Sequence, residues 1–359
     1  MKKIKTAILG CNGLVGQQFA RLLDDHPYFE LSCVTASQRS SGKRYGETMA
    51  PELQAVIGAR TASLTIMTTT AEALVRSGAR IVFSALPADI AGALELELRQ
   101  QGMAVFSNAS SHRMDAVVPL LIPEVNASHL ELAWEQLRTH PGFIVTNPNC
   151  VVSGLAMVLK PLAGLGAQAA TVTTFQAVSG GGRRGVAAMD ILGNIIPFIP
   201  AEEEKIVRET RKILGTLDAA RVSDHDLDIF PACSRVPVRD GHLQSVSVEF
   251  PGPVTEGEIA AVLSGFSAEP QQMALPTAPR QPILVQPNAD RPQPALEVNA
   301  GEPAAARGMA VTVGRLRRQG NRCSFFLLVN NTVRGAAGGS VLNAELAVKK
   351  KLLPGVVHG

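Results

Sequence analysis

The chain has 359 residues, of which 46% are hydrophobic and 18% are charged, an ordinary balance for a globular protein with room for two domains. Its formal net charge of +3, without any dense Lys/Arg run, argues against a nucleic-acid-binding protein. We expect no membrane segment, because no run of about 18 apolar residues occurs. We also expect no metal site, and the five scattered cysteines favour a reducing cytoplasm.

The first part of the chain alternates between short apolar runs and helical patterns. The predicted strands are 5–10, 30–36, 64–68, 81–84 and 104–107, and the predicted helices are 14–23, 70–77 and 88–101. Such alternation is typical of a parallel sheet with helices on both faces. The sequence therefore predicts an N-terminal α/β domain of the Rossmann type.

After Cys150 the predicted pattern changes to longer strands separated by insertions. The predicted strands are 171–178, 232–238, 243–250, 309–316 and 323–329, with a charged helix at 202–214. This pattern indicates an α+β domain with a mostly antiparallel sheet.

The C-terminal part supplies the remaining expectations about domain organisation. The Pro- and Gln-rich segment 269–303 is interpreted as a loop or arm, and 339–353 as a helix that returns to the first domain. We expect a cofactor-binding domain at 1–149, completed by 332–359, and a catalytic and oligomerisation domain at 150–331.

Three glycines lie between the first predicted strand and the first predicted helix, in a GxxGxxG spacing. Glycine allows a tight turn and a close approach of the backbone to a pyrophosphate at a helix N-terminus. The spacing differs from the commoner GxGxxG, and the position at the first strand–helix turn is what makes it informative. The candidate cofactor-binding residues here are Gly10, Asn12, Gly13, Leu14, Val15 and Gly16.

The end of the second predicted strand indicates which dinucleotide binds. A NAD site usually has an acidic residue there for the ribose 2′-hydroxyl, but the segment 35–43 contains none. It offers Ser37, Arg39 and Ser40 instead, which suit a 2′-phosphate. The alternative is a solvated loop with an incidental arginine. We favour NADP as the cofactor.

The tetrapeptide Asn147-Pro148-Asn149-Cys150 follows an extended run and precedes an apolar, helix-compatible segment. Cys150 is therefore expected where a strand ends and a helix begins. Backbone N–H groups and the helix dipole there favour a thiolate, and the same N–H groups can hold an oxyanion. A buried, inert cysteine is the alternative.

His242 stands beyond an Asp-Gly turn that follows the predicted strand 232–238. A histidine in this place can act as general base for a thiol, although a strand-end histidine bonded to the backbone is the plainer interpretation without Cys150. Arg235, on the same strand, can point into the same cleft and grip a carboxylate. Arg113 and Lys205 are further cations, but their spacing alone assigns neither.

Taken together, these motifs resemble the aspartate-semialdehyde dehydrogenase family, and the match covers almost the whole chain. The archaeal and fungal-type branch is indicated by Gly-Met-Ala-Val-Thr-Val-Gly-Arg at 308–315 and Asn-Thr-Val-Arg-Gly-Ala-Ala-Gly at 331–338. The resemblance implies NADPH-dependent reduction of L-4-aspartyl phosphate to L-aspartate 4-semialdehyde with release of phosphate. This is a step toward lysine, threonine and methionine.

The resemblance also implies roles for individual residues. Cys150 is the implied nucleophile, His242 the acid/base and Gln176 the residue that orients the reacting group. The implied substrate ligands are Arg235 for the carboxylate, Arg113, Asn149 and Lys205 for phosphate, and Glu202 for the amino group, with Glu203 and Glu204 as neighbouring alternatives. The implied cofactor contacts near the nicotinamide are Ser179, Gly180 and Asn331.

Two segments depart from the family pattern. This chain has Gly181-Gly182-Arg183-Arg184-Gly185 where the branch commonly has Ala-Gly-Tyr-Pro-Gly, which places two arginines near the mouth of the site. After His242 the usual Thr-Glu is replaced by Leu243-Gln244, so an acid that could orient the base is missing.

Three rival functions remain at this point. A related acyl reductase, such as a malonyl-CoA reductase, would keep Cys150, His242 and NADP but change the pocket around Lys205 and Arg183. N-acetylglutamyl-phosphate reductase fits less well, because its cysteine typically follows Pro-Gly. A non-catalytic NADP-binding regulator would need none of these side chains. We expect a homodimer or homotetramer that binds a small acyl phosphate or semialdehyde.

Overall fold

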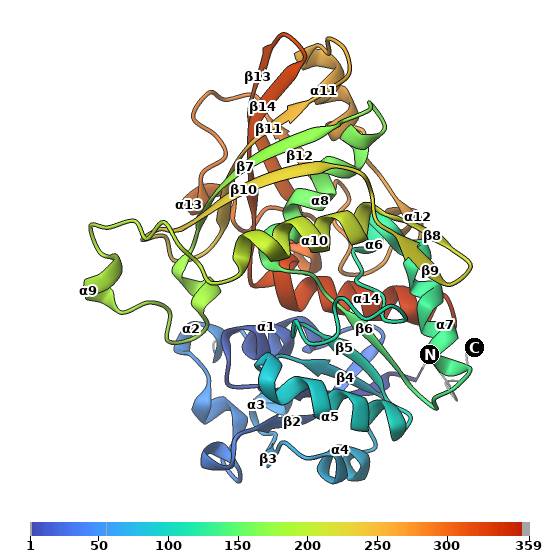
Figure 1. Cartoon of the computed structure of the whole chain (residues 1–359). Coiled ribbons are helices and arrows are strands. Elements are labelled where there is room, and N and C mark those ends of the chain that lie inside the picture. The colour runs from blue at the N-terminus through green and yellow to red at the C-terminus, as the bar shows by residue number, and fades with distance from the viewer. Residues whose placement is uncertain (1, 55, 354–359) are drawn as a thin grey trace.

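The fold is built on two six-stranded sheets, seen in the lower and upper parts of Figure 1, in a computed structural model that describes residues 2–54 and 56–353. The lower sheet is parallel throughout and has the order β3-β2-β1-β4-β5-β6. Its strands are β1 (Ile4–Leu9), β2 (Phe29–Ala36), β3 (Ile66–Thr68), β4 (Ile81–Ser84), β5 (Ala104–Ser107) and β6 (Phe143–Thr146). The strand order reverses between β1 and β4, where sheets of this kind bind dinucleotides. The predicted Rossmann-type sheet is confirmed.

Helices cover both faces of this parallel sheet, which explains why β4, β5 and β6 are buried along their whole lengths. The helices of this part are α1 (Leu14–Leu23), α2 (Pro51–Gln54), α3 (Ala59–Ala62), α4 (Ala71–Ser77), α5 (Ala88–Gln100), α6 (Pro123–Asn126) and α7 (Glu131–Leu137).

The C-terminal helix α14 (Gly338–Lys349) packs against α1, β4 and β5, and this contact confirms that it returns to the first domain. Val341, Leu342 and Leu346 are fully buried in the core that α14 shares with the parallel sheet. Nearly every residue of α14 is buried, so the helix is enclosed on all sides and does not pack through one face alone.

The second sheet has the order β10-β7-β11-β14-β13-β12. Its inner pairings are antiparallel, and its two edge pairings, β10 with β7 and β12 with β13, are parallel. Its strands are β7 (Ala169–Gln176), β10 (Asp228–Arg235), β11 (His242–Glu249), β12 (Ile283–Gln286), β13 (Val311–Gln319) and β14 (Arg322–Val329), beside a small hairpin of β8 (Thr216–Asp218) and β9 (Arg221–Ser223). The strand predicted at 232–238 is shifted: it ends at Arg235, because Pro237 has no N–H for the ladder.

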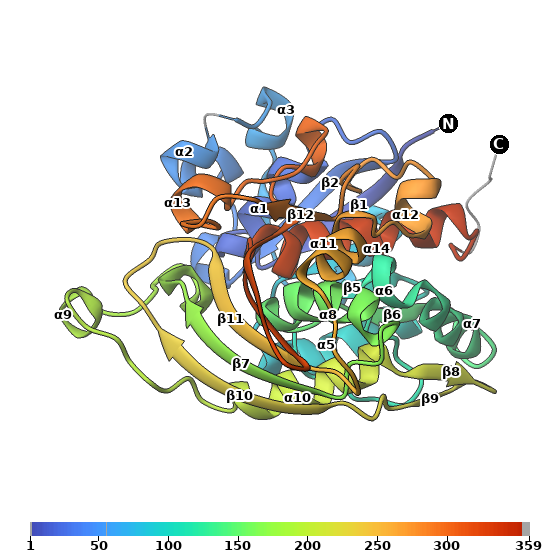
Figure 2. The same cartoon turned by 90° about the horizontal axis from the view of Figure 1, so that it is seen from above.

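Three longer helices pack against strands of the second sheet, and Figure 2 shows them on one side of it. They are α8 (Cys150–Ala163), α10 (Glu202–Leu214) and α11 (Glu256–Ser264). The short α9 (Ala188–Ile191) lies on an arm that projects from the body at the left of Figure 1.

The segment 269–303 is not only a loop or arm, as the sequence suggested. It contains α12 (Glu269–Gln272), β12 and α13 (Pro294–Glu297), and β12 pairs with β13 as an edge strand of the second sheet. Leu275 and Ala278 join the core of the first domain. Proline is tolerated here because the segment lies at an edge and between short elements.

We propose to keep the domain limits 1–149 and 150–331, with the C-terminal part completing the first domain; residues 354–359 lie outside the described part. Packing crosses these limits, since Leu120 and Ile122, from the first domain, belong to the hydrophobic core between α8 and the second sheet. Within the described residues, no helix combines the length and apolar character that a membrane crossing requires.

Candidate active site

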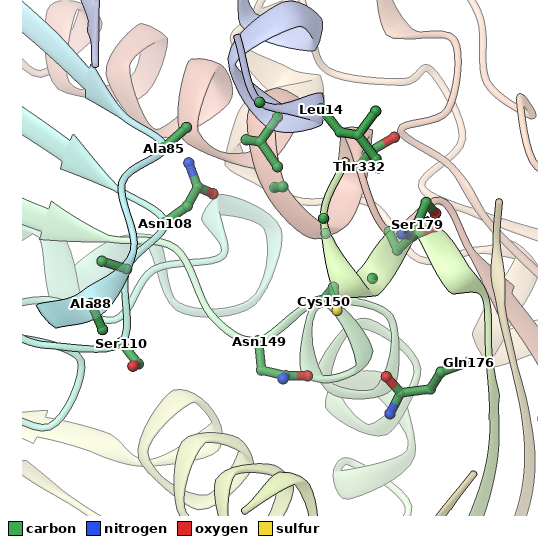
Figure 3. A pocket seen from close by; sticks show the side chains of 18 of the residues that line it. Leu14, Ala85, Ala88, Asn108, Ser110, Asn149, Cys150, Gln176, Ser179 and Thr332 are labelled. Atoms are coloured by element: carbon green, nitrogen blue, oxygen red, sulfur yellow. Dashed lines mark hydrogen bonds between the residues drawn. The ribbon is translucent and has the colours of Figure 1, made fainter. Parts of the chain in front are cut away.

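A cavity of about 500 Å³ lies between the two domains, at the carboxyl ends of the parallel strands. Figure 3 looks into it. Leu14 and Thr332 lie on one side, Asn149 and Gln176 on the other, and Cys150 between them. The cavity therefore brings the glycine turn, the cysteine and residues of the second sheet to one place.

Cys150 is the first residue of α8, as its position before an apolar run predicted. Asn149 is the N-cap, and its Oδ1 accepts from the Val151 N–H at 2.8 Å and the Val152 N–H at 3.4 Å. These two N–H groups are therefore occupied. The Cys150 N–H remains, and it lowers the pKa of its own thiol. Fewer donors are free for an oxyanion than the sequence suggested.

The charge state of the thiol differs from the expectation of a thiolate. Burial raises the pKa of the Cys150 thiol to about 12, and the Glu202 carboxylate adds to the rise, while Arg113 and Arg235 oppose it. Desolvation of the charged form outweighs the helix start and both cations. The raised pKa favours the neutral thiol over the thiolate as the resting form.

His242 is fully buried at the first residue of β11, with Nε2 3.2 Å from Cys150 Sγ. Its Nδ1 accepts from the Ala177 N–H at 3.0 Å. The proton of the neutral ring must therefore be on Nε2, which faces the sulfur as a donor. Burial lowers the pKa of His242 to about 3, with the Arg235 charge as a second cause, so the ring rests neutral.

Three adjacent strand ends of the second sheet bring Gln176, Arg235 and His242 together. Arg235 on β10 is paired with Gln176 at the end of β7, and β11 begins with His242 on the other side of β7. Arg235 Nη1 donates to the Ala177 carbonyl at 2.8 Å, which leaves further guanidinium donors for a ligand. The missing acid after His242 does not disorder the ring, because Ala177 orients it instead.

Glu202 connects the cysteine loop with the second sheet. Its Oε1 accepts from Asn149 Nδ2 at 2.9 Å and from Gln176 Nε2 at 3.1 Å. Of the three consecutive glutamates, Glu202 lines the cavity, whereas Glu203 accepts from the Cys233 N–H and Glu204 is exposed. The geometry favours Glu202 over its two neighbours.

Glu209 is a buried site residue that the sequence reasoning missed. Its carboxylate accepts from Arg113 Nη1 at 2.8 Å and from the Asn149 N–H at 2.6 Å. It thus joins a cation of the cavity to the backbone just before Cys150. The signal was the spacing on α10: Glu202, Lys205 and Glu209 are three and four residues apart and share a helix face.

The same helix supplies two lysines with different surroundings. Lys205 lines the cavity beside Arg113. Lys212 is buried and donates to the carbonyl oxygens of Arg113 at 2.7 Å, Asp115 at 2.9 Å and Val118 at 3.1 Å. Lys212 therefore holds the loop that carries Arg113.

The glycine turn has the close packing that its sequence implied. Gly10 has a φ of 73°, and a Cβ at Gly16 would come within 2.3 Å of the Gly10 carbonyl oxygen. Gly13, Leu14 and Val15 line the cavity, whereas the Asn12 side chain is turned to Thr48 and supports the turn. The helix α1 begins without a side-chain cap, so its first N–H groups are open to an anion.

The residues predicted to hold a 2′-phosphate follow β2, the neighbour of β1 at the same sheet edge. Arg39 and Ser40 form a 3₁₀ turn after Ser37, and the Ser37 and Arg39 side chains are exposed. They lie outside the lining of the cavity that holds Cys150. An adenosine end at β2 and a reactive end at Cys150 fit one extended dinucleotide.

Near the expected nicotinamide position, Asn331 Nδ2 donates to Ser179 Oγ at 2.9 Å and Asn331 Oδ1 accepts from the Gly241 N–H. A Cβ at Gly180 would come within 2.6 Å of Arg235 Nη1 and 3.1 Å of His242 Cε1. Gly180 therefore leaves the room that the Arg235 guanidinium and the His242 ring occupy. In the described part of the chain, no cluster of three or more His, Cys, Asp or Glu side chains is arranged to hold a metal.

The neutral thiol leads to a pH prediction for the cofactor-free protein. Since the Cys150 pKa is raised, the thiolate fraction is small at neutral pH and grows with pH. Alkylation by iodoacetamide should therefore become faster by about tenfold per pH unit between about pH 6 and pH 9. The Cys150→Ser protein gives the background. A rate that is already constant near neutral pH would mean a thiolate–imidazolium pair and would contradict this charge state.

Comparison with known proteins shows to which class of protein this fold and site belong. Residues 5–133 match the semialdehyde dehydrogenase NAD-binding domain, and residues 159–334 match the semialdehyde dehydrogenase dimerisation domain. The parallel sheet, the dimerisation domain and the thiol in the cavity between them define the class, a dinucleotide-binding semialdehyde dehydrogenase.

Relatives of known name narrow the class. The aspartate-semialdehyde dehydrogenase of Archaeoglobus fulgidus is 42% identical over 98% of this chain and 100% of its own, and that of Aspergillus fumigatus is 40% identical over 97% and 98%. The crystal structure of the Candida albicans enzyme with NADP has a TM-score of 0.87 at 34% identity, covering 97% of this chain and 99% of its own. This chain belongs to the aspartate-semialdehyde dehydrogenase family.

Proposed function

We propose that this chain converts L-4-aspartyl phosphate and NADPH to L-aspartate 4-semialdehyde, NADP and phosphate through a thioester on Cys150. The single observation that carries the proposal is the 3.2 Å contact between Cys150 Sγ and His242 Nε2 in a cavity that also holds Arg113, Lys205 and Arg235. The names of the relatives support the same reaction. The product then serves lysine, threonine and methionine biosynthesis in the cytoplasm.

The cations of the cavity bind the two anionic ends of the substrate. A guanidinium grips a carboxylate in bidentate fashion, and Arg235 has donors left for this purpose beside its bond to Ala177. Arg113, Lys205 and the Asn149 side chain receive the phosphate. Glu202 receives the amino group. Its buried carboxylate accepts two amide donors through Oε1, and the second oxygen, Oε2, can accept from an ammonium group.

Cys150 attacks the acyl carbon, the bond to phosphate breaks, and a thioester forms on sulfur. This covalent step divides one difficult reaction into two easier ones. Because the resting thiol is neutral and His242 Nε2 already carries a proton, the thiol proton passes to the phosphate as that group leaves. We assign Gln176 and the Cys150 N–H to the acyl oxygen; Gln176 Nε2, which donates to Glu202 and Thr174 in the free protein, would turn to the substrate.

The cofactor, when bound, supplies the hydride that reduces the thioester. His242 then acts as a hydrogen-bond donor through Nε2. Its Nε2–H stabilises the oxygen that gains charge, and afterwards the sulfur as it leaves as thiolate. The aldehyde is released when the carbon–sulfur bond breaks, and the Cys150 thiolate takes up one proton from solvent to return to the resting thiol.

The residues at the β1 and β2 ends fit NADP. The uncapped start of α1 suits the diphosphate, and Ser37, Arg39 and Ser40 at the end of β2 suit a 2′-phosphate. In the described part of the chain, Arg39 has no hydrogen bond or ion pair of its own, so its charge is free for a ligand.

The cofactor preference can be tested at Arg39. Arg39→Ala should weaken binding of NADPH by about tenfold and leave binding of NADH nearly unchanged, because only NADPH carries the 2′-phosphate that the guanidinium would neutralise. Dissociation constants from nucleotide fluorescence measure this without turnover. Equal affinity of the unaltered protein for both nucleotides would contradict the assignment.

We also propose that the chain acts as a homodimer or homotetramer. Membership in a family with a dimerisation domain supports a homo-oligomer. The α9 arm exposes Met189, Leu192 and Phe198, apolar side chains that a second copy could cover.

Two coupled assays separate the proposed reaction from its rival. The first follows phosphate-dependent reduction of NADP with aspartate semialdehyde, and the second follows CoA-dependent reduction with malonate semialdehyde. The proposal expects activity in the first and only a trace in the second. Activity in the second alone would favour an acyl-CoA reductase, and activity in neither would favour a binding protein.

A further inference from the structure

Arg183 belongs to the segment in which this chain departs from its family pattern, and its position is set by glycines. Gly182 and Gly185 have φ values of 81° and 58°, in the left-handed region that glycine adopts readily. These residues turn the chain after the 3₁₀ helix Val178–Gly181. The turn directs Arg183 out of the second domain toward the first.

Arg183 contacts the glycine turn directly. Its Nη1 donates to the Asn12 carbonyl at 3.1 Å and to the Thr48 carbonyl at 3.2 Å. Asn12 immediately precedes Gly13, the N-cap of α1. The guanidinium therefore lies beside the open helix N-terminus at which a diphosphate would bind.

The glycine turn does not depend on Arg183 for its shape. Gln17 Nε2 already donates to the Asn12 carbonyl at 3.0 Å, and Thr48 Oγ1 donates to Asn12 Oδ1 at 2.8 Å. Tyr45 Oη donates to the Cys11 carbonyl at 2.9 Å. The first domain thus holds its own turn, and Arg183 adds a positive charge to a surface that is already built.

The remaining donors of Arg183 are free to bind an anion. Its Nε and Nη2 have no partner among the described residues, and the side chain lines the same cavity as Gly13, Leu14 and Val15. A planar guanidinium donates two parallel hydrogen bonds to phosphate oxygens, which makes arginine well suited to such a site.

We propose that Arg183 is a ligand of the cofactor diphosphate, contributed by the second domain across the cavity mouth. This inference rests on the proposed function for the presence of a nicotinamide dinucleotide. The two arginines then bind different parts of the nucleotide. Arg39 binds the 2′-phosphate, which only NADP has, and Arg183 binds the diphosphate, which NAD and NADP share.

The test compares dissociation constants of NADP and NAD in the full chain, measured by calorimetry. Arg183→Ala should weaken both nucleotides by about tenfold and leave their ratio unchanged, since the diphosphate is common to both. Arg184→Ala is the matched control, because Arg184 lines the neighbouring pocket with Arg239 and Asp240 and not the cavity that holds Gly13, whereas Arg183 lines both. It should stay within about twofold of the unaltered protein. Arg39→Ala should change the ratio.

Two results would overturn the inference. If Arg183→Ala binds both nucleotides as the unaltered protein does, Arg183 only connects the two domains. That conclusion holds even if the substitution lowers the melting temperature. If it weakens NADP alone, Arg183 contacts the 2′-phosphate. The semialdehyde assay on the unaltered protein is run in parallel. Turnover there, with binding insensitive to Arg183, would reject this inference and leave the proposed function standing.

Discussion

Cys150→Ser should lower kcat for the semialdehyde reaction by a factor on the order of 10³ or more, because a hydroxyl is a far weaker nucleophile and leaving group than a thiol in this covalent route. Serine fits the same space at the start of α8, so the fold should be kept. Steady-state rates measure the loss. The dissociation constant of NADP and the denaturant unfolding curve are the controls, and both should be unchanged. Activity well above a trace in the serine protein would contradict the thioester route.

His242→Ala should lower kcat by a factor on the order of 10² to 10⁴, the usual range for losing a positioned proton donor. His242→Gln should lose less, because its side-chain amide can place an N–H near the position of the imidazole Nε2–H, 3.2 Å from the sulfur. The comparison isolates hydrogen-bond donation from proton exchange.

Both histidine variants need the same controls as the serine protein, since His242 is fully buried. Intact NADP binding and cooperative unfolding would show that lost activity reflects chemistry. If glutamine and alanine lose equal amounts of activity, donation from Nε2 is not what His242 supplies. The tautomer that Ala177 imposes would then have to change during the reaction.

The parallel sheet could be predicted because its strands are short apolar runs and the runs 5–10, 64–68 and 81–84 are each followed by a helical pattern. Local sequence also located Cys150, since the Pro-Asn pair and the apolar run define where α8 begins. The strands of the second sheet were harder to delimit. Residues 232–238 looked extended throughout, but the regular pairing of β10 with β7 ends at Arg235, and only single bonds, such as that from the Val236 N–H to the Gln176 carbonyl, continue beyond it.

The site was predicted as a set of residues but not as a network. Glu209 was missed because acids and bases on a helix surface usually indicate a solvated face, and only the tertiary fold buries this one against Arg113 and Asn149. The tautomer of His242 depends on the Ala177 N–H, a backbone group that no residue pattern reveals.

For Cys150 the sequence showed only one of the two opposing effects on the thiol pKa. The helix start is visible in the sequence, but the depth of burial is not, and burial has the larger effect on the pKa. The segment 269–303 was misjudged because its prolines hide a four-residue edge strand, β12, that exists only by pairing with β13.

The most direct test of the covalent route is a single-turnover measurement without phosphate. Aspartate semialdehyde and NADP are mixed with the protein, and NADPH formation is followed while the Cys150 peptide is examined by mass spectrometry. We expect a burst of NADPH equal to the number of active sites and an aspartyl adduct on Cys150, with further turnover only after phosphate is added. NADPH formation that requires phosphate from the first turnover, with no adduct on Cys150, would contradict the thioester route.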